Sequence, residues 1–157
     1  MGSMNSKADM RRRVIQACMA RQQAVADVAR SEMDSAQQQS NDYGQNVDRY
    51  DSFRTKMMRS RDMHARRLAE AAEGLRVLEA LLRQPPHSVA DHGAVVITTG
   101  LRLFLAIGLG KFAPDDAPDE EYYAVSAAVP LYAAVHGKRV GDTVVIAGRL
   151  HTITDIF

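Results

Sequence analysis

The sequence predicts an α+β fold: a long N-terminal antiparallel coiled-coil hairpin of two helices, followed by a small antiparallel β domain with one short helix. Residues 9–43 contain neither Gly nor Pro. On both sides of the next polar segment, candidate core residues recur at alternating intervals of three and four, which is the coiled-coil period. After a proline pair the pattern becomes strand-like. We therefore expect these segments: a hairpin over 8–84 with its tip at about 40–54, a linker over 85–92, and a β domain over 93–157.

The composition is that of a soluble globular protein, with 157 residues, 25% of them charged and 46% hydrophobic. The net charge of +1 hides an asymmetry. Residues 1–84 hold 15 Lys and Arg against 11 Asp and Glu, a balance of +4, whereas residues 85–157 hold 5 against 8, a balance of −3. Opposite signs indicate two modules with different surfaces. Neither module is basic enough to require nucleic acid as a direct partner.

Cysteine usage and hydropathy favour a cytoplasmic protein without membrane contact. Cys18 is the only cysteine, so no intrachain disulfide can form, and a reducing compartment is the simpler expectation. We interpret Cys18 as a small apolar residue on a helix face rather than as a reactive thiol. No apolar run approaches the ~20 residues that span a bilayer, and we find no apolar core of a signal peptide near the N-terminus.

The first helix is predicted to begin with Asp9 as its N-terminal cap. Several of its inner-face positions are small or polar, so this helix needs a partner. The inner-face candidates are Ile15, Cys18, Gln22, Val25, Ala29, Glu32 or Met33, and Ala36.

The second helix repeats the same alternation and becomes more apolar toward its end, so the base of the hairpin should be its best-packed part. At ~1.5 Å per residue, each arm should extend roughly 45–50 Å. We expect His64 to pack rather than to bind metal, because no second His or Cys lies at metal spacing. Met57, Met58 and Met63 are expected to fill the seam. The inner-face candidates are Phe53, Met57, Ser60 or Arg61, His64, Leu68, Ala71, Leu75, Leu78 and Leu82.

The β domain is predicted from short apolar runs separated by turn residues. A loop is expected over 108–110 and 114–121, and a short helix should have Pro130 in its first turn and Gly137 after its end. Gly148-Arg149 should form the turn of a terminal hairpin. The predicted strands are 94–99, 101–107, 122–126, 143–147 and 150–156.

This C-terminal pattern resembles the last domain of the bacterial Gre transcript-cleavage factors (the GreA/GreB family), which has an FKBP-like fold. The residues that carry the resemblance are, in order, Pro130-Leu131, Ala134-Val135-His136-Gly137-Lys138 and Gly141-Asp142-Thr143-Val144. The match covers roughly residues 93–157. Val129 departs from the family, which usually has serine before the proline, and this change bears on local packing more than on activity.

The N-terminal half is similar to the same family in its architecture of a long coiled coil, a hinge and then this domain. Its tip resembles that of a compact Bacteroidetes-like variant, which has the form Asp-Lys-Tyr-Glu-Thr-Gly-Arg. The corresponding residues are Asp48-Arg49-Tyr50-Asp51-Ser52-Phe53-Arg54.

The resemblance implies a transcription elongation factor rather than an enzyme. Its coiled coil would enter the secondary channel of RNA polymerase and stimulate cleavage of backtracked RNA, meeting the nascent RNA 3′ end indirectly. Asp48 and Asp51 would be the catalytic pair and would hold a Mg²⁺ ion shared with the polymerase. Without the polymerase, the protein would bind no Mg²⁺. Arg49, Tyr50 and Arg54 would contact polymerase or phosphate. No small-molecule substrate is implied.

Three features of the tip leave alternatives open. Asp51 stands where the family has Glu, which shortens its reach by one methylene. A second register would match Asp42 and Gln45 to the acidic pair, with Asn46 following, and would predict little cleavage. Acids near a helix start are also common as caps that favour the positive end of the helix dipole. The corresponding alternatives are a non-cleaving regulator in the same channel and a coiled-coil adaptor for protein interactions.

Overall fold

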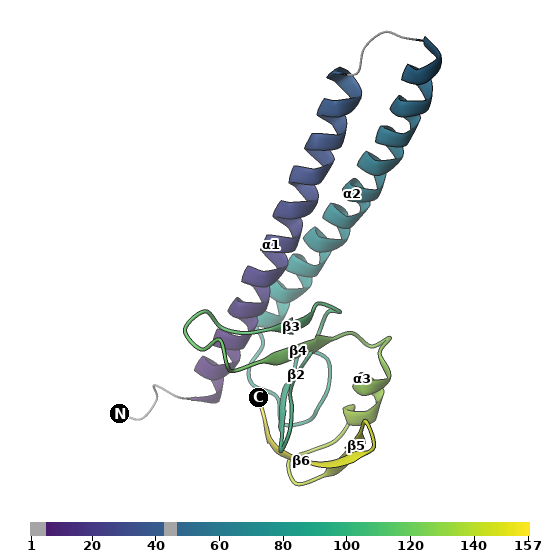
Figure 1. The fold of residues 1–157 in the computed structure, drawn as a ribbon. Helices are drawn as coiled ribbons and strands as arrows, with labels where there is room; N and C mark the ends of the chain where they lie inside the picture. Colours follow the sequence, from purple (N-terminus) through teal and green to yellow (C-terminus); the bar gives the residue numbers. More distant parts are fainter. Residues whose placement is uncertain (1–5, 43–46) are drawn as a thin grey trace. The chain divides into compact units, whose positions relative to one another are not determined.

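The computed structural model describes residues 6–42 and 47–157, with side chains for residues 6–39 and 52–157 (Figure 1). Two helices of 36 residues each, α1 and α2, confirm the predicted long helices, and the sheet that follows them confirms the α+β fold. The elements are α1 Lys7–Asp42, α2 Val47–Leu82, β1 Val95–Thr98, β2 Arg102–Leu105, β3 Gly110–Phe112, β4 Tyr122–Val125, α3 Pro130–Val135, β5 Thr143–Ile146 and β6 Arg149–Ile156.

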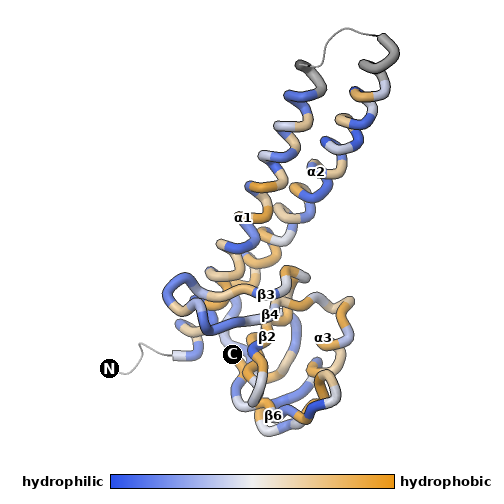
Figure 2. The backbone as a smooth tube through the Cα atoms, in the orientation of Figure 1, coloured by the Kyte–Doolittle hydropathy of each residue, from blue (hydrophilic) through white to orange (hydrophobic). Residues whose placement is uncertain are grey.

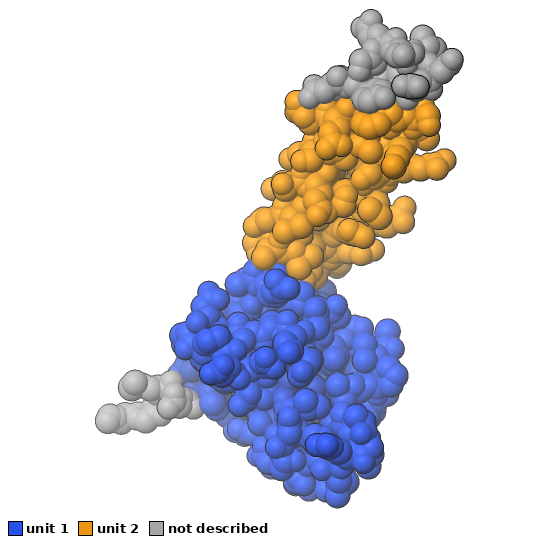
Figure 3. Space-filling view, in the orientation of Figure 1, with its two compact units in different colours: residues 1–21, 76–157 blue, residues 22–75 orange. Residues whose placement is uncertain are grey.

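The chain divides into two compact units (Figure 3). The base unit, residues 1–21 and 76–157, combines the first turns of α1, the last turns of α2 and the whole sheet. The hairpin unit, residues 22–75, contains the rest of the two helices. The segment predicted as a linker lies in the base unit and is bonded to it, because Ala90 donates its N–H to Lys138 O (2.8 Å) and accepts from Gly137 N (2.7 Å).

The N-terminus of α1 is capped by Ser6, and the predicted cap at Asp9 is wrong. The Asp9 N–H donates to Ser6 Oγ (3.2 Å), and the Met10 N–H donates to Ser6 O (2.9 Å). A serine hydroxyl that accepts from the third N–H of a helix is a typical N-cap. Asp9 therefore lies in the first helical turn, where its negative charge favours the positive end of the helix dipole.

The sheet has six strands in the order β3-β4-β2-β1-β6-β5. All neighbours are antiparallel except β2 and β4, which run parallel, so the prediction of a purely antiparallel sheet is wrong at one pairing. The pairing of β3 with β4 was also missed, because Gly110 was predicted as loop and Lys111 and Phe112 were assigned to no strand. The chain reverses between β3 and β4, and this reversal brings β4 alongside β2 in the parallel sense.

The turns follow the predicted glycines with one shift. Ala147 and Gly148, both with positive φ (52° and 79°), form the two-residue turn between β5 and β6, as a type I′ turn requires. Arg149 was predicted in this turn but starts β6, opposite Ile146. The short helix α3 begins at Pro130, and Gly137 follows its end with φ 83°, as predicted.

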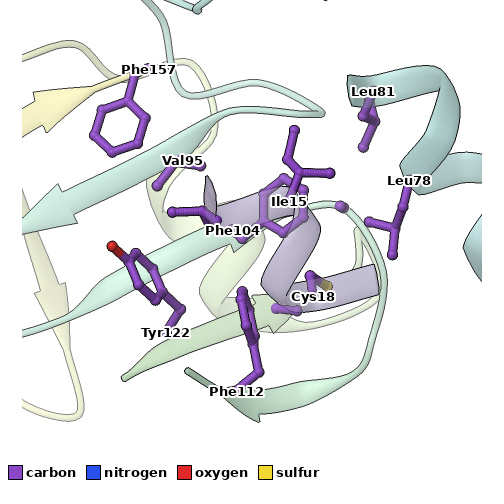
Figure 4. Packing of buried hydrophobic residues seen from close by; sticks show 12 residues of the cluster. Ile15, Cys18, Leu78, Leu81, Val95, Phe104, Phe112, Tyr122 and Phe157 are labelled. Carbon is purple, nitrogen blue, oxygen red and sulfur yellow. The ribbon is translucent and has the colours of Figure 1, made fainter. Parts of the chain in front are cut away.

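Apolar clusters cover both faces of the central strands, whose neighbouring residues point to opposite sides of the sheet. One hydrophobic cluster joins Val95 and Phe104 to the helix ends, through Ile15, Cys18 and Leu78 (Figure 4). A second cluster lies on the other face and contains Val96, Leu103, Leu105, Tyr132 and Val135. In Figure 2 the apolar residues gather in the base unit, whereas hydrophilic residues recur along both helices of the hairpin unit.

Candidate functional site

The acidic pair proposed from the tip sequence lies in the first turns of α2. The helix begins at Val47, so the i, i+3 spacing of Asp48 and Asp51 falls on helical backbone. The side chains of this pair, and those of Arg49 and Tyr50, lie outside the described residues, and the acidic site stays a prediction.

The other tip residues are placed as far as the description reaches. Arg54 is exposed on α2. In the alternative register, Asp42 ends α1, while Gln45 and Asn46 lie outside the described residues. The choice between the two registers therefore also stays a prediction.

One exposed face of α2 follows the acidic pair and was missed by sequence reasoning. Ser52, Thr55, Lys56 and Arg59 line an open hollow of about 540 Å³. All four are exposed, and their spacing of three, one and three residues keeps them on one side of a helix. Two hydroxyls and two cations suit an anionic partner. The i, i+3, i+4, i+7 spacing of polar residues was the available signal, but beyond Arg54 only the apolar face of this helix was interpreted.

The seam of the hairpin unit is built mainly from small residues. Ala26, Ala29, Ala36 and Ala71 are buried. Val25 was predicted to face the partner helix but is 38% exposed, and Ala26 takes its place with 5% exposure. A straight α-helix has 3.6 residues per turn, whereas an alternation of three and four averages 3.5. Positions chosen by that alternation therefore rotate gradually away from the partner helix.

Polar side chains complete this seam. Gln22 Nε2 donates to Ala71 O (3.2 Å), and an Arg61 N–H donates to Gln37 Oε1 (3.2 Å). Polar contacts of this kind specify one register between two helices. They require the two helices to stay aligned along the described part of the hairpin unit.

His64 belongs to the seam, as predicted, with a side chain only 12% exposed. Its Nδ1 lies 3.0 Å from Glu32 Oε2, but the orientation of the two groups does not allow a hydrogen bond. The two side chains form an ion pair only when the imidazole is protonated. Among the described residues no cluster of three or more His, Cys, Asp or Glu could hold a metal ion. Met63 was predicted to fill the seam but is 43% exposed, whereas Met57 and Met58 are partly buried.

Arg11 organises the base unit and was also missed from the sequence. Its side chain is 2% exposed and donates to three carbonyl oxygens: Leu81 (2.6 Å), Gln84 (3.0 Å) and Gly93 (2.9 Å). Burial lowers the pKa of the Arg11 guanidinium, yet arginine stays charged in proteins. A buried cation at the C-terminus of α2 also favours the negative end of that helix dipole.

The single cysteine is a core residue. Cys18 is fully buried, and burial raises the pKa of its thiol to about 12. Because the thiolate is the nucleophilic form, this environment agrees with the packing role expected from the sequence.

The residues that carry the resemblance lie in α3, in the turns between α3 and β5, and at the start of β5. Gly137 and Gly141 have positive φ values of 83° and 94°. Asp142 Oδ2 accepts the N–H of Arg139 (2.8 Å), which closes the turn into β5. These positions therefore have a structural reason for their residue types.

Comparisons with protein-family models, curated proteins and solved structures returned no match. Within the described ranges, neither long helix has a stretch apolar enough to cross a bilayer.

Proposed function

We propose that this protein is a Gre-like transcription elongation factor that binds RNA polymerase in the cytoplasm. Its helical hairpin enters the secondary channel of the polymerase, and acidic residues at the start of α2 stimulate the polymerase's own cleavage of backtracked RNA. Asp48 and Asp51 act there, with Arg49, Tyr50 and Arg54 as contacts to the polymerase or to phosphate.

The observation that carries this proposal is that the acidic pair falls at the start of one of two long helices. Two helices of 36 residues each, about 50 Å long at 1.5 Å per residue, flank the short segment 43–46. Asp48 and Asp51 lie in the first turns of α2. The last turns of α2, from Arg76, belong to the base unit. The residues of the Gre resemblance lie in the base unit, in α3, in the turns that follow it and at the start of β5.

The exposed hydroxyls and cations after the acidic pair support a partner that carries phosphate. Lys56 and Arg59 hold positive charge beside two hydroxyl groups on one exposed face of α2. Backbone phosphates of nucleic acids are bound by such groups. This face supports the approach of an RNA-bearing complex and stands independently of the acidic pair.

The donor set at the start of α2 fits a shared magnesium ion rather than an ion held by this chain alone. Magnesium prefers oxygen ligands, keeps several waters, and is often bound through one or two carboxylates. Asp48 and Asp51 are two carboxylates at i, i+3 on helical backbone, which suits a site completed by a partner. A second metal ion of this kind would supply charge stabilisation for phosphodiester cleavage.

The test is RNA cleavage by stalled, backtracked elongation complexes with the wild-type protein and with Asp48→Asn plus Asp51→Asn. We expect the wild type to shorten the RNA and the double variant to do so much more slowly, while both bind core polymerase. The matched control is Asp27→Asn plus Asp34→Asn, two exposed acids on α1, which should cleave at the wild-type rate. Equal cleavage by all three proteins would refute the assigned roles.

Binding without cleavage would identify the protein as a non-cleaving regulator of the same channel. This outcome corresponds to the Asp42 and Gln45 register, which leaves one carboxylate. Failure to co-purify with core polymerase at low salt would favour a coiled-coil adaptor instead.

A further inference from the structure

A groove of about 600 Å³ lies in the base unit. It is lined by the first turns of α1, by the loop before β4, and by residues of β1, β2, β4 and the end of β6. Its size is that of a small-molecule site, since such sites usually measure about 300–1,000 Å³. Everything that lines it belongs to one compact unit.

Part of the groove is apolar. Met10, Ile97 and Phe157 line it with an unbranched, a branched and an aromatic side chain. Tyr122 adds a ring whose packing is already set, because it stacks on Phe112 with centroids 5.6 Å apart. Figure 4 shows Tyr122 and Phe157 among the residues of the core cluster. The groove can therefore hold an apolar body against a preformed wall.

The acids that line the groove are already paired with cations of the chain. Asp155 Oδ1 lies 3.1 Å from Lys7 Nζ, and Asp9 Oδ1 lies 3.6 Å from an Arg12 nitrogen. Glu120, the third acid, accepts hydrogen bonds from other side chains of the groove. The charges of these carboxylates are thus largely balanced without a ligand.

Glu120 is held from two sides. It accepts two hydrogen bonds from Arg13 (3.1 and 3.3 Å) and one from the Tyr122 hydroxyl (2.6 Å). Arg13 also donates to Asp116 Oδ1 (3.0 Å), so this arginine has its own two carboxylates. This arrangement fixes one wall of the groove and leaves neither group in need of a further charge.

Arg102 differs from Arg13, the other arginine that lines the groove, in its ion pairs. Its guanidinium carbon lies 5.9 Å from the centroid of the Tyr122 ring, and it forms no ion pair within 4 Å in the part of the chain that the structure describes. Its side chain is only partly exposed. A guanidinium held beside an aromatic ring can still offer paired N–H donors to an oxyanion.

We propose that this groove binds a small organic acid, in which one carboxylate meets Arg102 and an apolar body packs on Met10, Ile97 and Phe157. Arg102 acts on the Glu120 carboxylate through space, but it forms no ion pair within 4 Å among the described groove residues, so a single negative charge matches this cation. A phosphate, which carries about two negative charges at neutral pH, brings more charge than the single cation Arg102 balances and is disfavoured. The proposal does not depend on the function assigned to the hairpin.

The experiment is a titration of the isotope-labelled full chain at neutral pH, followed by the amide NMR signals of Ile97 and Phe157. Octanoate, octanol and octyl phosphate are the probes, since they share one apolar body and differ in the head group. We expect octanoate to shift both signals and to bind more tightly than the other two. Arg102→Gln should weaken octanoate binding about tenfold, as loss of a hydrogen bond to a charged group predicts.

Arg149→Gln is the matched control, because Arg149 is an exposed arginine of the same unit that does not line the groove. It should leave octanoate binding unchanged. Arg102→Lys serves as the second variant, because it keeps the charge but loses the paired donors, and should weaken binding less than Arg102→Gln. Three results would overturn the proposal: no groove shifts with octanoate, equal weakening by Arg102→Gln and Arg149→Gln, or tighter binding of octyl phosphate than of octanoate.

Discussion

Arg11 provides the sharpest test of how the base unit is held together. Replacing it with Met keeps a similar side-chain length and removes the donors that reach Leu81, Gln84 and Gly93. These acceptors come from the end of α2 and from the segment that precedes β1. The substitution therefore separates α1 from two other parts of the same unit.

The expected cost follows from the number of acceptors that lose a donor. Each lost hydrogen bond to the charged Arg11 side chain removes about 1.5 kcal/mol, the low end of the range for charged groups. Three bonds give about 4.5 kcal/mol, from which the desolvation penalty of the guanidinium, no longer incurred, must be subtracted. Because Arg11 is 2% exposed and Met packs well in irregular spaces, we expect a net loss of about 2–3 kcal/mol.

Urea unfolding followed by tyrosine fluorescence and far-ultraviolet circular dichroism measures this loss. Arg12→Met is the control, since the Arg12 side chain is 59% exposed, and it should change the free energy of unfolding by less than about 0.5 kcal/mol. Arg11→Lys should fall between the two, because one ammonium cannot reach three separated carbonyls. An Arg11→Met protein as stable as the Arg12→Met protein would refute the reasoning.

Three further predictions concern single side chains of the base unit. Burial raises the pKa of the Glu120 carboxyl, but hydrogen bonds from Tyr122 and Arg13 lower it by more, so its folded pKa lies below the ordinary value of 4.5. The carboxylate thus contributes stability above a pH of about 4.5 that is lost as pH falls through the folded pKa. In urea titrations across pH, the free energy of unfolding of Glu120→Gln should therefore decrease less at acid pH than that of the wild type. Cys18 should react with iodoacetamide only as fast as the base unit opens, so labelling should accelerate in urea in step with unfolding; rapid labelling of the native protein would contradict its burial. Val129 occupies the N-cap of α3 with extended backbone (φ −91°, ψ 134°) and no side-chain cap, so Val129→Ser should raise the unfolding free energy by about 1 kcal/mol, and an equal gain in Val129→Ala would exclude capping as the cause.

The long helices could be predicted because their signals are local. The absence of Gly and Pro sets the length of α1, and the proline pair after α2 ends the second helix. Glycine positions likewise predicted the end of α3 and the turn before β6. Boundaries shifted where a cap or a turn depended on one hydrogen bond, as with Ser6 in place of Asp9.

The pairing of distant strands could not be predicted in the same way. β3 has three residues and begins with Gly110, so it carries neither the length nor the alternation of a strand. The parallel pairing of β2 with β4 depends on where the chain crosses after β3, and nothing in either strand encodes that direction. The partner and the direction of each strand are determined by packing on both faces of the sheet.

The two sites differ in how visible they are in the sequence. The proposed acidic pair lies within one short segment, Asp48 to Arg54, so the order of the residues alone was enough to propose it. The groove gathers Met10, Arg102, Glu120 and Phe157 from four separate segments. Arg102 differs from other arginines only by what surrounds it, and its surroundings exist only in the folded base unit.

The alanines of the hairpin seam also determine how thick that unit is. Helices with small residues at their contact can approach to about 8 Å between axes, the low end of the usual 8–10 Å range. The pair of helices is therefore slender where it is joined by Ala26, Ala29, Ala36 and Ala71. These small side chains also bury little apolar area, so they contribute little hydrophobic stability. Leucine at these positions would add hydrophobic stability and push the helices apart. Under the proposed function, in which the hairpin enters a channel, a narrow cross-section matters more than a stable core.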